Sequence, residues 1–220
     1  MAIYMWRDVQ EREPTSDTYT YLPLTATDQI TNYGTSWEFR SAHSTTLSFW
    51  VYDGVDCLRL NNNGTVYKET FRDGSFTALL RIRPSSTSAG YCFGVSDIRV
   101  RINNGSLVVT SINTSGSFVT TTVASNLSAS VRYLIIITYE KTATTGNWTL
   151  VCDIKGASVD TQQTAVQRNS SRSSNMCVGN YVSSTSGFFW LVSSFIIEDK
   201  VWTEQDKNNY YITTKWNYWL

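Results

Sequence analysis

The feature that most constrains the fold is a series of short segments rich in Val, Ile, Thr, Phe and Tyr. Clusters of Asn, Gly and Ser separate these segments at intervals of about ten residues. Branched and aromatic side chains favour strands, whereas the residues of the intervening clusters favour turns. This spacing is typical of an antiparallel β-sandwich or barrel. We therefore expect an all-β fold.

Five of the expected strands follow one another directly. They cover Phe76 to Arg83, Tyr91 to Val95, Ile98 to Ile102, Leu107 to Ile112 and Phe118 to Ala124. Asn103, Asn104 and Gly105 predict a tight turn between the strand that ends at Ile102 and the strand that begins at Leu107. Together these strands predict a continuous meander.

The most apolar segment of the chain runs from Val131 to Glu140 and reads VRYLIIITYE. Its unbroken apolar run predicts a strand that is covered on both faces and lies at the centre of a sheet. Further strands are expected at Tyr19 to Leu24, Trp148 to Ile154, Met176 to Val178 and Phe188 to Ile197.

A helix signal appears only near the end of the chain. Thr203 is a favourable N-cap residue, and acidic residues follow it in the expected first turn. We expect a short helix there, which Tyr210 and Tyr211 pack onto the sandwich.

The length of 220 residues, 41% of them hydrophobic, suits one main domain. We expect an N-terminal arm at residues 1–18, the sandwich domain at 19–214 and an aromatic tail at 215–220. The arm is charged and contains Pro14, so it is either a frayed terminus or a strap between subunits.

The charge balance and the cysteines exclude several classes of protein. The chain has 18 basic and 18 acidic residues, which argues against nucleic acid as a partner. Neither a signal peptide nor a membrane span is evident, so we expect synthesis in a host cytoplasm and no membrane insertion. The cysteines show no CxxC spacing and are expected to be small buried apolar residues rather than disulfide partners. They are Cys57, Cys92, Cys152 and Cys177.

The order of the segments resembles the concanavalin A-like lectin/glucanase superfamily in its laminin-G-like branch. The segments that carry the resemblance are YLPLTATDQITNYG, FTALLRIRP, VRYLIIITYEKTATTGNWTLVCDIKG, MCVGN and GFFWLVSSFIIEDKVWTEQD, between Tyr19 and Asp206. The resemblance implies a concanavalin A-like jelly-roll sandwich of two antiparallel sheets with a short C-terminal helix. Fold alone does not determine function.

The N-terminal arm, the Ser/Thr/Asn-rich composition and the aromatic C-terminus are similar to such domains in phage and other virion structural proteins. The leading hypothesis is therefore a non-enzymatic virion protein: a capsid decoration, head-fibre or tail-associated jelly roll. Its expected partners are other copies of itself and capsid proteins, in the virion. The expected interaction residues are Trp6, Trp216, Tyr218, Trp219 and Leu220, and the last six residues are either an intersubunit anchor or packed on their own domain.

The sequence gives no support for an enzyme. Glycosidases of this superfamily need two carboxylates about 5 Å apart on one strand face, as an E-x-D-x-x-E run supplies, and the chain has no such run. The nearest acidic pairs, expected to be surface charges, are Glu69 with Asp73, Glu198 with Asp199, and Glu204 with Asp206. The single histidine, His43, has no Asp or Cys beside it. We expect no cofactor.

Asp28 is a weak candidate for a metal ligand. In laminin-G-like relatives a Ca²⁺ often lies between an Asp at this position and an acidic residue in a late strand. Here the late position falls on Ser193 and Ser194, which offer no carboxylate. We expect no metal site, with Asp28 bracing its own turn.

The alternative function is a lectin-like module that attaches its carrier to cell-surface glycans. Sugar binding needs an exposed aromatic face with polar side chains beside it. Candidate residues are Trp37, Trp50, Asn62, Asn63, Tyr91 and Tyr181. Each aromatic residue among them could instead pack in the core.

Overall fold

The fold was analysed on a computed structural model of the chain. The structure describes residues 18–21, 38–41, 48–52, 55–60, 64–68, 75–95, 98–112, 115, 117–141, 148–156, 159–168, 176–179, 190–198 and 200–214. Within these residues, side chains are described for 75–94, 98–111, 115, 117–140, 154–155, 179 and 200–212.

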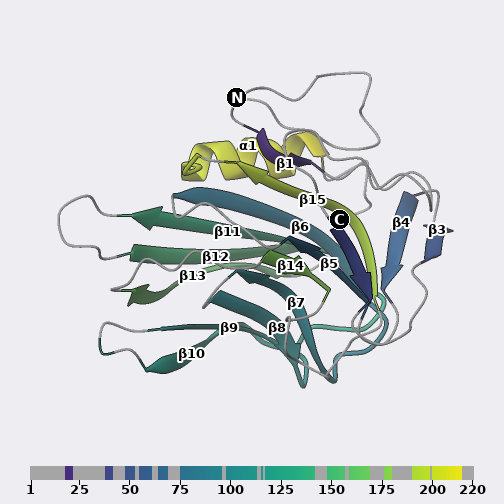
Figure 1. Ribbon diagram of the computed structural model, residues 1–220, viewed down its shortest axis with the longest axis horizontal. Helices are drawn as coiled ribbons and strands as arrows, with labels where there is room; N and C mark the ends of the chain where they lie inside the picture. Colours follow the sequence, from purple (N-terminus) through teal and green to yellow (C-terminus); the bar gives the residue numbers. More distant parts are fainter. Residues whose placement is uncertain are drawn as a thin grey trace.

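The described residues form two antiparallel sheets (Figure 1). The first sheet has the order β13 (Val159–Arg168), β12 (Trp148–Gly156), β11 (Tyr133–Lys141), β6 (Phe76–Pro84), β15 (Trp190–Glu198), β4 (Val55–Leu60) and β3 (Ser48–Tyr52), and β1 (Thr18–Tyr21) also pairs with β15. The second has the order β10 (Phe118–Ala124), β9 (Ser106–Ile112), β8 (Ile98–Asn103), β7 (Ala89–Val95), β14 (Met176–Val178), β5 (Gly64–Lys68) and β2 (Glu38–Ser41).

A single helix, α1 (Glu204–Thr214), is present in the described part of the chain. Figure 1 shows it across the first sheet, on the side away from β7 to β10. The molecule therefore has three layers there: the helix, the first sheet and the second sheet. The predicted fold class is confirmed, since two antiparallel sheets and a short C-terminal helix are present.

The core lies on both faces of β6 and β11. In register, Leu80 pairs with Ile135 and Leu79 pairs with Ile136, and all four side chains are buried. Successive side chains of a strand point to opposite faces, so one pair faces the second sheet and the other faces α1. The prediction that VRYLIIITYE is a central strand covered on both faces is confirmed.

The predicted meander is wrong at its first strand. β7 to β10 do form a meander in the second sheet, but β6 belongs to the first sheet. The reason is burial: almost every residue of β6 is covered, so the strand needs a layer on each side. After Pro84 the chain crosses to the other sheet through residues 85–88.

The predicted tight turn between β8 and β9 is confirmed. Asn104 has φ 47° and Gly105 has φ 74°, which is the left-handed pair of a two-residue hairpin turn. The Asn104 N–H donates to Ser88 O at 3.2 Å, and the Gly105 N–H donates to Thr87 O at 2.8 Å. The hairpin is thus attached to the loop that enters β7.

Candidate functional site

The two sheets differ in how their outer faces are covered. Along β6 almost every residue is buried, whereas along β8 buried and half-exposed residues alternate. The alternation means that one face of β8 packs into the core and the other reaches the surface. The outer face of the second sheet is therefore accessible at β8, while that of the first sheet is covered at β6.

Helix α1 is fastened to the first sheet by buried side chains. The Thr77 hydroxyl donates to Lys200 O at 2.6 Å and accepts from the Trp202 N–H at 2.9 Å. The rings of Trp202 and Tyr210 meet edge to face, and the Arg81 guanidinium lies 5.1 Å from the Tyr210 ring centroid. The expected packing of Tyr210 on the sandwich is confirmed, since its side chain is fully buried.

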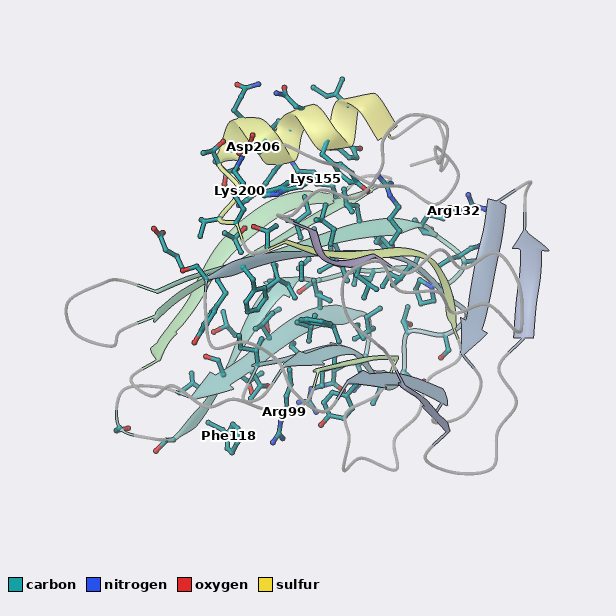
Figure 2. The ribbon with its side chains drawn as sticks, turned by 45° about the horizontal axis from the view of Figure 1, so that its top comes forward. Arg99, Phe118, Arg132, Lys155, Lys200 and Asp206 are labelled. Carbon is teal, nitrogen blue, oxygen red and sulfur yellow. The ribbon has the colours of Figure 1, made fainter. Side chains whose placement is uncertain are left out.

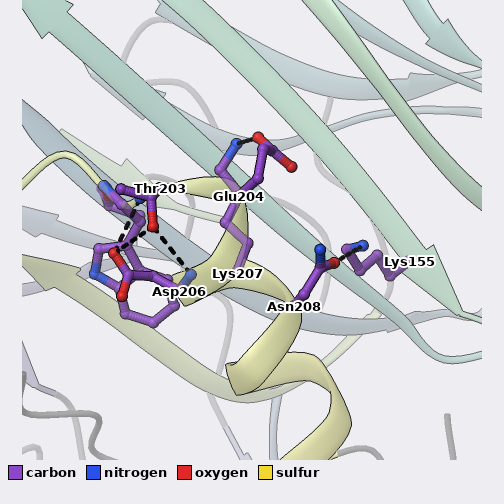
Figure 3. A network of polar contacts seen from close by, with 8 residues as sticks. Lys155, Thr203, Glu204, Asp206, Lys207 and Asn208 are labelled. Atoms are coloured by element: carbon purple, nitrogen blue, oxygen red, sulfur yellow. Dashed lines mark hydrogen bonds and ion pairs between the residues drawn. The ribbon is translucent and has the colours of Figure 1, made fainter.

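Polar contacts fix the first turns of α1 (Figure 3). The Asp206 N–H donates to Thr203 Oγ1 at 3.2 Å, and the Thr203 N–H donates to Asp206 Oδ2 at 3.0 Å, which makes a capping box. Burial raises the pKa of Asp206, but the hydrogen bonds from Thr203 and the nearby charge of Lys200 outweigh burial and hold that pKa below its usual range. The predicted N-cap is confirmed.

The remaining polar contacts of α1 also hold structure together. The Lys207 Nζ lies 2.7 Å from Glu204 Oε1, and the Lys207 side chain is only 2% exposed. The Lys155 Nζ donates to Asn208 Oδ1 at 3.0 Å and lies over the ring of Tyr211. Glu204 is thus paired with a lysine and Asp206 caps the helix, so this acidic pair has no catalytic arrangement.

The candidate site is a set of side chains on the outer face of β7 to β10. In register, Tyr91 pairs with Arg101, Arg101 with Val108, and Val108 with Thr122. One step along the strands, Arg99 pairs with Thr110, and Thr110 with Thr120. Directly paired residues of antiparallel strands share a face. We call this set the arginine–threonine face: Tyr91, Arg99, Arg101, Val108, Thr110, Phe118, Thr120 and Thr122.

Arg99 and Phe118 form the most distinctive contact of the arginine–threonine face. The Arg99 guanidinium lies 4.6 Å from the centroid of the Phe118 ring, although the ring is 54% exposed. Figure 2 shows both side chains on the outer side of the second sheet, far from Lys200 and Asp206 at the helix. An exposed cation–π contact contributes about 0.5–1 kcal/mol, so it orients the guanidinium at the surface.

A hydrogen bond and a buried apolar side chain also belong to the arginine–threonine face. The Thr110 and Thr120 hydroxyls are hydrogen-bonded to each other at 2.8 Å. Val108 lies on the same outer face as its paired neighbours, Arg101 and Thr122, yet its side chain is only 5% exposed. Long arginine stems commonly cover apolar neighbours in this way. The face therefore presents guanidinium groups, hydroxyls and an aromatic ring on a rigid sheet.

The structure places one of the predicted glycan residues on this face. Tyr91 is half-buried on β7 and is paired with Arg101. Trp50 lies on β3, paired with Cys57, and its side chain is outside the described residues. The other predicted residues lie outside the described residues: Trp6, Asp28, Trp37, Asn62, Asn63, Tyr181, Trp216, Tyr218, Trp219 and Leu220, together with His43 and Glu69 with Asp73. Those predictions stay predictions.

Arg99, Arg101 and Phe118 were not among the residues predicted from the sequence. A usable signal was the alternation in IRVRIN, where the arginines occupy every second position and so share one face. Phe118 carries no such signal, because an aromatic residue that opens a strand is more often buried. Only the register of three strands brings it to Arg99.

Among the described residues, no group of three or more His, Cys, Asp or Glu side chains is arranged to hold a metal ion. No described helix is both long enough and apolar enough to cross a membrane. Cys92 is buried, as expected of a small apolar residue, and the side chains of Cys57, Cys152 and Cys177 are outside the described residues.

The fold is similar to toxin binding domains of known structure. The receptor-binding domain of botulinum neurotoxin type G superposes with a TM-score of 0.64 at 15% identity, covering 90% of this chain and 52% of that one. The receptor-binding domain of botulinum neurotoxin D gives 0.60 at 11% identity, covering 90% and 53%. The binding domain of Paraclostridial Mosquitocidal Protein 1 gives 0.57 at 15% identity, covering 88% and 51%. The chain spans about half the length of each.

No protein-family model and no curated protein matches the sequence. The structural similarity establishes the β-sandwich, a fold that these toxins use in their binding domains. It does not single out the concanavalin A-like superfamily or a phage protein, so those two assignments stay predictions.

Proposed function

We propose that the chain is a non-enzymatic binding domain that attaches its carrier to cell-surface glycans through the arginine–threonine face. The observation that carries the proposal is the Arg99–Phe118 stack on an exposed sheet, with a row of threonine hydroxyls beside it. An exposed ring packs against the apolar side of a sugar, while guanidinium and hydroxyl groups bond its oxygens. The expected affinity is millimolar to micromolar, as for a small polar interface.

The two acidic residues at the start of α1 support a non-enzymatic role. Glu204 is bound to Lys207 and Asp206 caps α1. Glycoside hydrolysis needs two carboxylates on either side of the scissile bond, and these two have other partners. The similarity to receptor-binding domains of toxins agrees with this role.

A glycan array tests the proposal with a matched pair of variants. Phe118 and Ile212 are both large exposed apolar residues, 54% and 57% exposed, but Ile212 lies on α1. Wild type should bind at least one glycan on the array. Phe118→Ala should weaken that binding about tenfold, the effect of about 1.4 kcal/mol, and Ile212→Ala should leave it unchanged.

Two results would contradict the proposal. One is a folded wild-type protein that binds no glycan. The other is a loss of binding in Ile212→Ala with full binding in Phe118→Ala, which would show that the binding site is on the helix. Circular dichroism of both variants checks that they are folded.

The carrier predicted from the sequence is a virion, and this location stays a prediction. Electron microscopy of purified particles labelled with an antibody against the chain tests it. Labelled particles would support the prediction, and particles that lack the chain would oppose it. The binding proposal does not depend on the outcome, because a glycan-binding domain serves equally on a virion or another carrier.

A further inference from the structure

The charge around the arginine–threonine face differs from that of the whole chain. The chain as a whole is neutral, with 18 basic and 18 acidic residues. Between Asp97 and Glu140, however, the sequence contains no acidic residue and three arginines: Arg99, Arg101 and Arg132. Strands β8, β9 and β10 all lie in this interval. The described side chains of these strands therefore include two arginines and no acidic residue, which favours an anionic ligand.

The two arginines of the face are held side by side. Arg99 and Arg101 are separated by one residue on β8, which puts their backbone positions about 7 Å apart on one face. Each is partly buried, and neither is fully covered. Arg99 is stacked on Phe118, and Arg101 lies between Tyr91 and Val108 in the register. Two arginines thus lie on one face of β8, with Phe118 next to Arg99 and Tyr91 paired with Arg101.

The chemistry of the guanidinium group narrows the class of possible ligands further. Stacking on an aromatic ring uses the flat face of the group, whereas its N–H donors lie in the plane and match the two oxygens of a carboxylate. We propose that the arginine–threonine face binds glycans that contain carboxylated sugar residues, with Arg99 and Arg101 bonding the carboxylates and Phe118 packing against a sugar ring. This inference rests on the proposed function and specifies its ligand class.

A saccharide fits this face better than other polyanions do. Nucleic acids and anionic membranes are bound by extended basic surfaces, because many phosphates must be neutralised together. Here the cationic part is confined to two arginines of one strand, in a chain with no net charge. The threonine hydroxyls and the exposed ring beside them suit the hydroxyl-rich edge and the apolar side of a sugar ring.

Calorimetry with defined probes tests the inference. The acidic probes are hexasaccharides of hyaluronan and of polygalacturonate and an α2,8-linked sialic acid hexamer, and the neutral probes are chitohexaose and a galactan hexasaccharide. At least one acidic probe should bind, more weakly at higher salt. The double variant Arg99→Gln/Arg101→Gln should raise its Kd about tenfold or more, since two charge-assisted contacts are lost.

Arg132→Gln is the matched control. It removes the same charge from the same acid-free interval, but Figure 2 places Arg132 well away from Arg99 and Phe118. Its Kd should equal that of wild type. An equal loss of affinity in Arg132→Gln would overturn the inference, because it would show that binding follows net charge alone.

The other outcomes separate the inference from the proposed function. Binding of neutral probes only would overturn the inference and leave the proposed function standing. Binding of no saccharide by folded protein would overturn both. Equally tight binding of a DNA dodecamer or of phosphatidylserine vesicles would overturn the inference, since the face would then be a general anion surface.

Discussion

Thr77 and Thr138 are two buried threonines that face each other across β6 and β11. The Thr77 hydroxyl joins the first sheet to the segment before α1 through Lys200 and Trp202. The Thr138 hydroxyl is buried without a hydrogen-bond partner among the described residues. A buried hydroxyl without a partner destabilises a fold, whereas a bonded one is expensive to remove.

Substitution by valine should therefore have opposite effects at these two positions. Thr138→Val should raise the free energy of unfolding by about 0.5–1 kcal/mol, because it removes an unbonded hydroxyl. Thr77→Val should lower it by about 1–3 kcal/mol, because the Trp202 N–H loses its acceptor. Urea denaturation followed by tryptophan fluorescence measures both. A destabilised Thr138→Val would mean that its hydroxyl has a partner.

Residue identities alone pointed to only part of the candidate site. Tyr91 was predicted because aromatic residues bind sugars, and it does lie on the arginine–threonine face. Phe118 and Arg99 were not predicted, because they are far apart in sequence and come from strands that are not direct neighbours. Their contact exists only after β9 has paired with both β8 and β10. The predicted meander gives the order of these three strands, but local pattern does not give the register that brings the two side chains together.

At the scale of elements, α1 was the most predictable, because its start is encoded locally. Thr203 and Asp206 are three residues apart and satisfy each other's N–H groups. In contrast, β13 was not predicted at all: its sequence, VDTQQTAVQR, lacks the alternation of a half-buried strand. β13 forms because β12 offers it a long pairing edge. The strand is thus stabilised by its tertiary pairing, which the sequence of the segment does not indicate.

The capping box makes the stability of the protein depend on pH through Asp206. The pKa of Asp206 is lowered in the folded state, so the charged carboxylate stabilises the fold above the unfolded pKa of about 4, and this contribution is lost as the pH falls through the lower folded value. Asp206→Asn should cost about 0.5–1 kcal/mol at pH 7. The difference from wild type should shrink as the pH falls below about 4.

Urea denaturation of both proteins at pH 7, 4 and 3 measures this difference. Thr203→Ala supplies the control: it removes the hydroxyl that donates to Asp206 Oδ2 but keeps the backbone N–H donor, so adding Asp206→Asn should cost less than it does in wild type without becoming neutral. A difference between wild type and Asp206→Asn that stays constant with pH would contradict this role for the carboxylate.

At the scale of the whole molecule, the connections between distant segments decide what the chain presents to its surroundings. β15 inserts between β6 and β4, and β14 inserts between β7 and β5, so the last strands of the chain complete both sheets. Helix α1 then covers the first sheet. Sequence patterns predicted an antiparallel sandwich or barrel with a terminal helix, and the resemblance implied two sheets, but neither indicated which face the helix would cover. Because the helix covers the first sheet, the outer face of β8 to β10 stays accessible.

The similarity to toxin binding domains also belongs to this scale. It extends over about nine-tenths of this chain while identity stays at 11–15% in the three comparisons described above. Such similarity reflects a shared arrangement of layers rather than shared side chains, so it identifies the fold and no ligand. The class of ligand must therefore be inferred from the residues on the accessible face.

Amide chemical-shift mapping tests the central claim most directly. An acidic hexasaccharide that binds the ¹⁵N-labelled chain should shift the backbone amides of Arg99, Arg101, Thr110 and Thr120 and leave those of α1 unchanged. Shifts confined to α1, or to the far strands β3 and β4, would contradict the account, because glycan binding would then take place away from the arginine–threonine face.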